Sequence, residues 1–466
     1  MNPMVLSAQY SEIPDSLVSS ERKKPIPLSV KTMAVASQSG SASSGGQINF
    51  QISSSNGFIK PNSVYVKCRV ALTAVAGVAT ANAILAWGNA CRNSSSVIER
   101  FTVSSGNQLE SINNYGSSYI PTLLLHCANQ AYKNGDDGLL EAGFRGLTTW
   151  NYTDQGASSA NNAWVDVPSG VAYGTANTYV DVCIPLYSNL FSNEKAYPLA
   201  LMAQSTLIQL DLAVFGKAMY SAETVAPIVA GYTDFTVSNA QLCYDLIQVS
   251  PEYLMALKGQ MAQGMLYSIP FTSVLSSQFA KQGNSTTYSW GCGLSSLKGV
   301  SYSCLTAPTT ITDPKYLRSD CTVGVLAGNN FRLFIDGQQQ NSMVQDSNSA
   351  RYASQQSVFG LLTDVNRSVC SGGILAYTGL VAGVLTPANT LSTNYATNAK
   401  TYDQNFFVGG QGCLKVNECL TMSGSQANNL SLIIETDQAT ATVVIANAWH
   451  DRILVVDGNG SCNIVL

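Results

Sequence analysis

The sequence has few charged residues. Asp, Glu, Lys and Arg make up 11% of its 466 residues, whereas an average soluble protein has about 25%. The 24 basic and 28 acidic residues leave a net charge of −4, so the chain lacks a basic footprint and no specific nucleic acid is predicted as a partner. A polar, nearly neutral surface suits a subunit that packs beside many copies of itself, because like charges repel. Many β-sandwiches are equally rich in Ser and Thr, so composition leaves both interpretations open.

Metal-binding patterns are missing as well. Only two histidines occur, and none of the twelve cysteines forms a C-x-x-C pair, the closest two being Cys413 and Cys419. These spacings do not match the usual zinc sites, so we predict no metal and no cofactor. The N-terminus has no charged start followed by an apolar run, so no secretory signal is expected and the thiols are predicted to be reduced.

Catalytic motifs are absent too. No G-x-S-x-G elbow, P-loop, G-x-G-x-x-G or H-E-x-x-H segment occurs. His126 and Cys127 are neighbours, but adjacent residues on a strand point to opposite faces and cannot form a dyad. His450 and Asp451 have no nucleophile tied to them, and we interpret them as a strand-end salt link or as ordinary loop residues. The sequence therefore predicts a protein that is not an enzyme and has no catalytic residues.

Three weaker signals have ordinary explanations. Asp136 and Asp137 in KNGDDG resemble half of a calcium loop, but the alternating oxygen ligands and closing Glu are missing, so a turn is predicted. The N-x-S/T triplets at Asn93 and Asn284 are expected by chance. The most apolar stretch, 71–87, is barely long enough to cross a bilayer, and we predict a buried strand and loop there.

The first 45 residues differ from the rest. They are rich in Ser, Pro and charge, and they end in SQSGSASSGG, which predicts an extended arm and linker. Their Arg22, Lys23 and Lys24 form the one basic cluster of the chain. We interpret this cluster as solvated, with contact to an anionic inner surface as the alternative.

From Gln47 onward the sequence reads as β-structure. Apolar and polar residues alternate between turn residues, which predicts these strands: INFQI, SVYVKCRVAL, VIERFTV, TYVDVCIPL, STLIQLDLAVF, FTVSNAQLCYDLIQV, NFRLFIDGQQ, LSLIIETD, ATVVIANAW and RILVVD. Helical spacing occurs only at 250–266, which opens with Ser250-Pro251-Glu252, and at 347–365. Such a series favours an all-β sandwich or jelly roll.

The two halves echo each other. Segments 101–119 and 331–352 each run strand, Gly-containing turn, Gln/Asn stretch and aromatic, and 235–249 matches 442–456 in pattern. The offset between matched segments is not constant, so an old duplication is the most that it indicates. Each half has about 200 residues, the length of a decorated eight-stranded jelly roll.

The predicted division of the chain follows from these signals. We predict an N-terminal arm and linker at 1–45, a first jelly roll at 46–250, a connecting helix at 251–262 and a second jelly roll at 263–466.

Several segments resemble the double jelly-roll major capsid proteins of polinton-like viruses, virophages, nucleocytoplasmic large DNA viruses and, more distantly, adenovirus hexons. The segments are 97–119 with its Asn114-Tyr115 pair, 184–213 with Phe191 and Pro198-Leu199, 235–257, 331–340 and 451–457. Together they extend over residues 50–460. The loops and the low charge depart from the better-known members, so the virus group is not identified.

The resemblance implies an all-β chain of two consecutive eight-stranded jelly rolls with long decorated loops and short helices. It implies the major capsid protein of a double-stranded DNA virus, three chains of which form a pseudo-hexagonal capsomer that tiles an icosahedral shell. Implied partners are further copies of the chain, minor capsid or penton proteins, and an internal membrane or inner-face protein that the N-terminal arm contacts. The protein would be assembled inside the host cell into the virion capsid and not secreted. Loops 129–179 and 371–402 would form trimer contacts and the outer crown.

A lectin or adhesin and an enzyme on a β-scaffold are the alternatives to a capsid protein. A tandem β-sandwich lectin or adhesin would bring a secretion signal and an aromatic platform or calcium loop, and neither is found in the sequence. An enzyme on a β-scaffold, such as a glycan lyase or hydrolase, needs paired carboxylates or a Lys/His base on neighbouring strands. The acidic residues here are sparse and mostly in predicted loops. A penton of the same viral lineage usually has one barrel, whereas this chain carries two barrel signatures.

Overall fold

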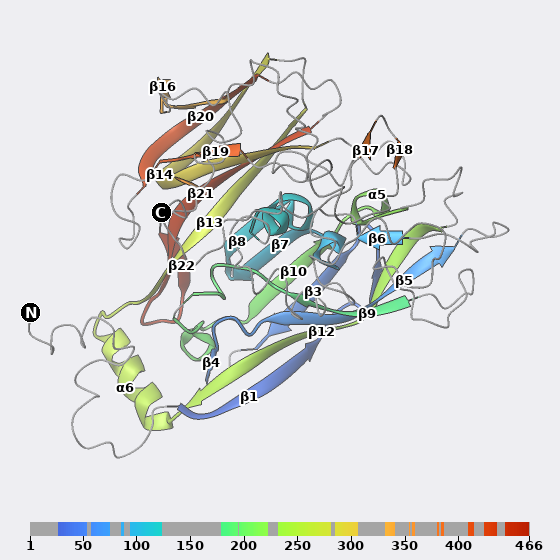
Figure 1. The fold of residues 1–466 in the computed structure, drawn as a ribbon. Helices are drawn as coiled ribbons and strands as arrows, with labels where there is room; N and C mark the ends of the chain where they lie inside the picture. The colour runs from blue at the N-terminus through green and yellow to red at the C-terminus, as the bar shows by residue number, and fades with distance from the viewer. Residues whose placement is uncertain are drawn as a thin grey trace, which may run out of the picture.

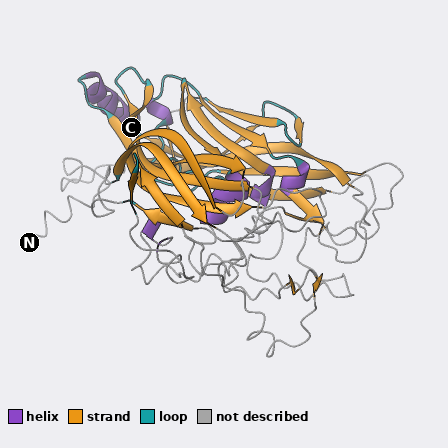
Figure 2. Cartoon of the chain, turned by 90° about the horizontal axis from the view of Figure 1, so that it is seen from above, coloured by secondary structure: helices purple, strands orange, loops and turns teal. Residues whose placement is uncertain are grey.

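Strands dominate the computed structural model of the chain, as the sequence predicts (Figures 1 and 2). The structure describes residues 27–53, 57–74, 85–87, 94–123, 179–193, 195–221, 232–280, 285–305, 331–340, 354, 357–358, 380–381, 384–385, 409–413, 424–435 and 443–465. In Figure 1 the second β-unit, yellow to red, lies above the first, blue to green.

The first unit is a jelly roll of two four-stranded sheets. One has the order β1-β12-β5-β9 and the other β3-β10-β7-β8, with short β2 and β4 added to β12. The strands are β1 (Pro27–Ala36), β3 (Gln47–Ile52), β5 (Tyr65–Ala74), β7 (Ile98–Ser105), β8 (Asn107–Asn113), β9 (Tyr179–Pro185), β10 (Thr206–Leu212) and β12 (Tyr232–Val249). Counted along the chain, the sheets read first-eighth-third-sixth and second-seventh-fourth-fifth.

The second unit repeats this order with one difference. Its strands are β13 (Tyr267–Ala280), β14 (Ser285–Leu305), β15 (Phe331–Ile335), β16 (Gln338–Gln339), β19 (Gly409–Gly412), β20 (Ser425–Glu435), β21 (Val443–Val456) and the added β22 (Cys462–Val465). The first part of β14 pairs with β20, and its last part pairs with β21 and β19. One strand thus serves as both second and third strand of this jelly roll, and its register shifts between Gly291 and Leu297 mark the bend.

The predicted echo between the halves corresponds to equivalent positions in the fold. Hairpins β7–β8 and β15–β16 are the fourth and fifth strands of their units, and both turn at a glycine with positive φ, Gly106 (72°) and Gly337 (82°). Strands β12 and β21 are the eighth strands. The prediction of two jelly rolls is confirmed.

Apolar burial continues from one unit into the other. The larger cluster of buried apolar residues combines the first jelly roll with Ile445 and Trp449 of β21, whereas Val444, Ala446 and Ala448 belong to the cluster inside the second. Strand β21 is therefore covered on both faces. This explains why its sequence is apolar at consecutive positions rather than alternating.

The predicted connecting helix is present. Helix α6 (Pro251–Ala262) follows β12 directly, and its N-cap Ser250 accepts a hydrogen bond from the backbone N–H of Tyr253 (3.2 Å). Pro251 at the first turn is preorganised for helix formation and gives up no hydrogen bond there. Leu254, Leu257 and Met261 are buried at helical spacing and join the helix to the core.

The predicted arm is wrong for residues 27–45. Strand β1 pairs with β12 from Pro27↔Val249 to Ala36↔Gln241, and β2 (Ser41–Ser43) pairs with β12 as well. An edge strand is held by backbone hydrogen bonds on one side, so the small polar residues that suggest a linker can also form one. Residues 1–26, including Arg22–Lys24, lie outside the described residues.

Other predicted segments are described only in part. Stretch 71–87 ends β5 and supplies β6 (Leu85–Trp87), which pairs with β11 (Met219–Ser221). Loop 371–402 contributes only β17 (Leu380–Val381) and β18 (Val384–Leu385), and Tyr179 of loop 129–179 begins β9. In 347–365 only residues 354 and 357–358 are described, and they are helical. ATVVIANAW and RILVVD form one strand, β21, and not two.

Candidate functional site at the junction of the jelly rolls

The two jelly rolls meet along one junction. The first unit contributes β8, the π-helix η3 (Tyr115–Tyr119) and the segment after β9, and the second contributes β13 and β21. In Figure 1, β8 lies close to β13. The junction fixes how one barrel stands beside the other. We therefore take it as the candidate functional site.

Side chains of the first unit cap an edge of β13. Three of them donate to backbone carbonyl oxygens spaced two residues apart, which lie along one edge of a strand. The pairs are Asn189 to Thr272 (2.7 Å), Asn193 to Pro270, and Lys195 to Ser268 (3.0 Å). The carbonyl of Pro270 points to this edge, and the residue has no N–H to offer a further strand. Within the described chain, β13 pairs with β21 alone, so loop side chains take the place of a strand on its other edge.

A second group of contacts surrounds η3. Asn114 adopts left-handed backbone angles (φ 51°, ψ 39°), which Asn tolerates better than most residues, and donates to the Ser276 hydroxyl (3.1 Å). Asn447 of β21 donates to Ser118 (3.0 Å), whose hydroxyl lies 3.4 Å from that of Ser303. These groups are buried, so each bond replaces one that water would otherwise make.

Aromatic rings continue the contact. Tyr119 stacks on Trp449 of the second unit, with centroids 5.7 Å apart and planes inclined by 25°. The Trp449 indole N–H donates to the Ser301 hydroxyl (2.8 Å), which fixes the ring. Gly116 allows η3 to approach its own unit, because a Cβ there would lie 2.2 Å from the Ser95 carbonyl oxygen.

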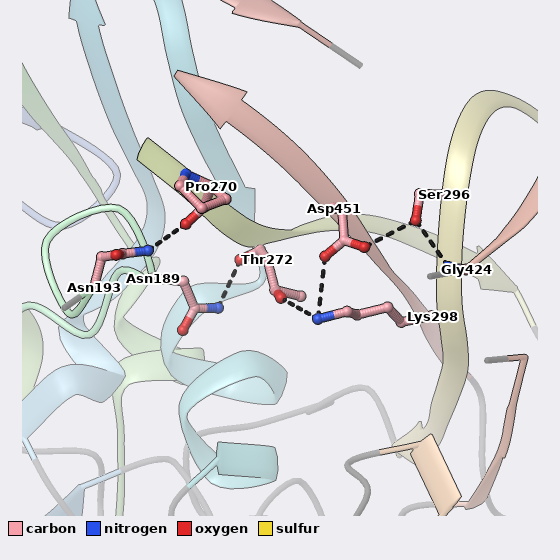
Figure 3. Close-up of polar contacts among 8 residues, drawn as sticks. All are labelled: Asn189, Asn193, Pro270, Thr272, Ser296, Lys298, Gly424 and Asp451. Atoms are coloured by element: carbon pink, nitrogen blue, oxygen red, sulfur yellow. Dashed lines mark hydrogen bonds and ion pairs between the residues drawn. The ribbon is translucent and has the colours of Figure 1, made fainter. Parts of the chain in front are cut away.

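A partly buried ion pair lies next to Thr272 (Figure 3). Lys298 Nζ of β14 lies 3.1 Å from Asp451 Oδ1 of β21, and it also donates to the Thr272 hydroxyl (3.0 Å). The Ser296 hydroxyl donates to Asp451 (2.8 Å) and accepts from the Gly424 N–H (3.0 Å). Thr272 thus joins the ion pair through its hydroxyl and the Asn189 side chain through its carbonyl oxygen.

A carboxyl group is buried on the first unit's side of the junction. Glu110 of β8 has no exposed surface and accepts a hydrogen bond from Ser188. Burial raises the pKa of Glu110 to about 7, against the opposing effects of the Ser188 hydrogen bond and the positive charge of Arg452. Arg452 of β21 donates to the Leu109 carbonyl oxygen (3.4 Å), and burial lowers the pKa of its guanidinium. Glu110 is therefore held largely protonated below neutral pH.

His450 lies two residues before Arg452 on β21. Burial first, and then the charge of Arg452, lowers the pKa of His450 to about 4. The imidazole is consequently neutral at physiological pH. It lies inside β21, with Asp451 as its neighbour.

The structure settles some of the site residues considered in the sequence. His450 and Asp451 lie within β21, so the salt-link interpretation of Asp451 is confirmed, but its position at a strand end is wrong. Cys413 is buried. The remaining residues lie outside the described residues; they are His126, Cys127, Asp136, Asp137, Asn93, Asn284 and Cys419.

Sequence reasoning missed the capping side chains. Asn189, Asn193 and Lys195 lie in an irregular segment, where no periodic pattern singles them out. The one available signal was Pro270 inside an otherwise regular strand, because proline in a sheet marks an edge. Glu110 also looked like an ordinary polar residue of a hairpin.

Neither a metal site nor a membrane-spanning helix is found among the described residues. Among them, no three His, Cys, Asp or Glu side chains are grouped so that they could hold a metal ion. No helix in the described part of the chain is both long and apolar enough to cross a membrane.

Comparison with known proteins finds likeness in structure and not in sequence. No family model and no curated protein sequence matches the chain. The Faustovirus major capsid protein superposes with a TM-score of 0.56 at 9% identity, over 96% of this chain and 94% of that one. A chain of the Sputnik virophage gives 0.56 at 13% identity, over 98% and 92%. The mavirus major capsid protein gives 0.51 at 13% identity, over 98% and 94%.

These alignments run over nearly the whole of each chain, so both jelly rolls are included. At such low identity they establish the fold alone. The chain has the double jelly-roll fold of viral major capsid proteins.

Proposed function

We propose that the chain is the major capsid protein of a double-stranded DNA virus. The observation that carries the proposal is a jelly-roll strand order that occurs twice in one chain, with a core and polar contacts that continue across the junction. A rigid pair of barrels is a unit that can tile a surface. The hydrogen bonds of the junction join residues of one barrel to residues of the other.

We propose further that three chains associate into a capsomer. Three chains bring six barrels, which gives a pseudo-hexagonal outline from a threefold assembly. Obligate interfaces bury about 2,000–5,000 Å2, and an 11% content of charged residues lowers the desolvation cost of burying such areas.

The remaining parts of the proposal concern partners and organisation. Residues 27–250 and 263–466 would be the two units and 251–262 their connection. Capsomers would contact one another and minor capsid or penton proteins in the virion, after assembly inside the host cell. An internal membrane or an inner-face protein is a further partner of the N-terminal arm. We infer no catalytic role; Asp451 pairs with Lys298 and accepts a hydrogen bond from Ser296.

The native mass of the purified protein tests the proposal. Three chains of 49.4 kDa, or 3 × 49.4 ≈ 148 kDa, are expected by native mass spectrometry and light scattering, unchanged on dilution. Electron microscopy of the same sample should give particles with a hexagonal outline. A monomer that persists at high concentration would overturn the proposal and favour a tandem β-sandwich lectin, for which a glycan-binding screen is the next measurement.

A further inference from the structure

Exposed apolar side chains gather at one end of the molecule. Of the seven large apolar residues exposed among those described, five lie on β1, on α6 and in the turn after α6. They are Val30 (54% exposed), Met33 (36%), Met255 (74%), Met265 (40%) and Leu266 (55%). We call this the β1–α6 surface.

The two elements are neighbours. Pro27 of β1 pairs with Val249, the residue before the N-cap of α6. Figure 1 shows β1 and α6 meeting at the lower edge, and Figure 2 shows α6 at one end of the molecule. The exposed residues therefore lie at one end of the fold, although they come from positions more than 200 apart in the sequence. Val30 and Met33, three positions apart on the edge strand β1, point to its opposite faces.

Helix α6 already buries one face. Leu254, Leu257 and Met261 pack into the core of the first jelly roll, yet Met255 on the same helix is the most exposed large apolar residue of those described. A surface helix normally keeps its outer face polar. Apolar residues on both sides indicate that something covers the outer side as well.

The chain itself supplies a segment of the right chemistry at the right place. Residues 1–26 lead directly into Pro27, beside α6. Nine of them are apolar or aromatic residues with large side chains: Met1, Met4, Val5, Leu6, Tyr10, Ile13, Leu17, Val18 and Ile26. The 12 residues of α6 span about 18 Å, which an extended chain crosses in about six residues. Residues 1–26 are therefore long enough to cross the whole of α6.

We propose that residues 1–26 fold back over the β1–α6 surface of their own chain. Such a path carries Arg22, Lys23 and Lys24 past the first turn of α6, where Glu252 is exposed. Opposite charges favour this direction over one that leads away from the helix. The proposal concerns a single chain, and it holds whether or not the chain builds a capsid.

The rate of methionine oxidation reports how accessible each methionine of this surface is to solvent. Peroxide converts an accessible methionine to its sulfoxide, and mass spectrometry measures the rate at each position. Met255 and Met265 should oxidise several-fold more slowly in the full chain than in a variant lacking residues 1–26. Buried Met202 and Met261 are internal controls: both should stay slow in both proteins. Fast oxidation of Met202 and Met261 would show that the deletion variant fails to fold. In that case the two full-length variants described next test the proposal.

Two full-length variants of matched charge make the test specific. L17D/V18D removes two apolar contacts and adds two negative charges, and it should speed oxidation of Met255. S19D/S20D adds the same charges without removing an apolar side chain, and it should leave the rate unchanged. Equal Met255 rates in the full chain and L17D/V18D would overturn the proposal. Protection that disappears on dilution would overturn it too, because a second copy would then be the cover.

Discussion

Asn189 of the first jelly roll donates to the carbonyl oxygen of Thr272 in the second, 2.7 Å away, while the hydroxyl of the same Thr272 accepts from Lys298, 3.0 Å away. One residue of β13 therefore receives a contact from the other barrel and one from the ion pair within its own barrel. A substitution that removes the Asn189 contact should therefore weaken the Lys298–Asp451 ion pair, and the reverse should hold as well.

Removing the capping amides should loosen the junction. In N189A/N193A the partly buried carbonyls of Thr272 and Pro270 lose their donors, and each lost hydrogen bond costs about 0.5–1.5 kcal/mol. We expect urea unfolding to begin at lower concentration and to separate into two transitions, one for each jelly roll. N459A is the control, since Asn459 is exposed in a turn. A single unshifted transition in N189A/N193A would contradict the role given to these residues.

Breaking the ion pair should cost more than breaking a surface pair. K298M leaves Asp451 buried without its cation, a loss of about 3–5 kcal/mol in the free energy of unfolding. R69M breaks the exposed Arg69–Asp181 pair (2.8 Å) and should cost much less, because solvent screens an exposed pair. The double variant K298M/D451L removes both charges of the pair and should recover part of the loss. Denaturant unfolding of the three variants checks this, and equal losses for K298M and R69M would refute it.

Glu110 should make stability depend on pH. Its pKa is raised from 4.5 to about 7 in the folded chain, so the folded state holds a proton that the unfolded state has released. The contribution of Glu110 to stability is therefore present below pH 4.5 and decreases as pH rises through about 7. E110Q should flatten the pH dependence of urea unfolding between these values. The same slope in wild type and E110Q would rule out this origin.

Gly116 should not tolerate a side chain. A Cβ at this position would lie 2.2 Å from the Ser95 carbonyl oxygen and 2.9 Å from that of Ile98, both backbone atoms. G116A should therefore destabilise the chain by at least about 1–3 kcal/mol. Gly216 in α5 (Phe215–Ala218) has open space around it, and G216A should be neutral or slightly stabilising. Thermal unfolding of the pair gives the comparison.

The sequence predicts what depends on local pattern. Alternation in TLIQLDL gives β10 with every second residue buried, and Ser250-Pro251-Glu252 marks the start of α6. The pairing of β1 with β12 escapes prediction, because it joins residues about 210 positions apart and an edge strand needs no apolar alternation.

The junction is harder to predict for the same reason. Its capping residues come from an irregular segment, and their partners are backbone carbonyls, which every residue has. The side chains of Asn189 and Asn193 become recognisable only once β13 is known to have an open edge beside them.

Strand β14 gives the two barrels different mechanics. In the first jelly roll the second and third strands are separate, β3 and β5, with β4 (Gly57–Ile59) between them. In the second they are one strand of 21 residues that bends from one sheet into the other. A continuous backbone resists splaying of the sheets, whereas a connecting segment can act as a hinge. In a trimer of the proposed kind, three stiff and three compliant barrels would alternate around the ring, so the capsomer would bend more easily along three directions than along the other three.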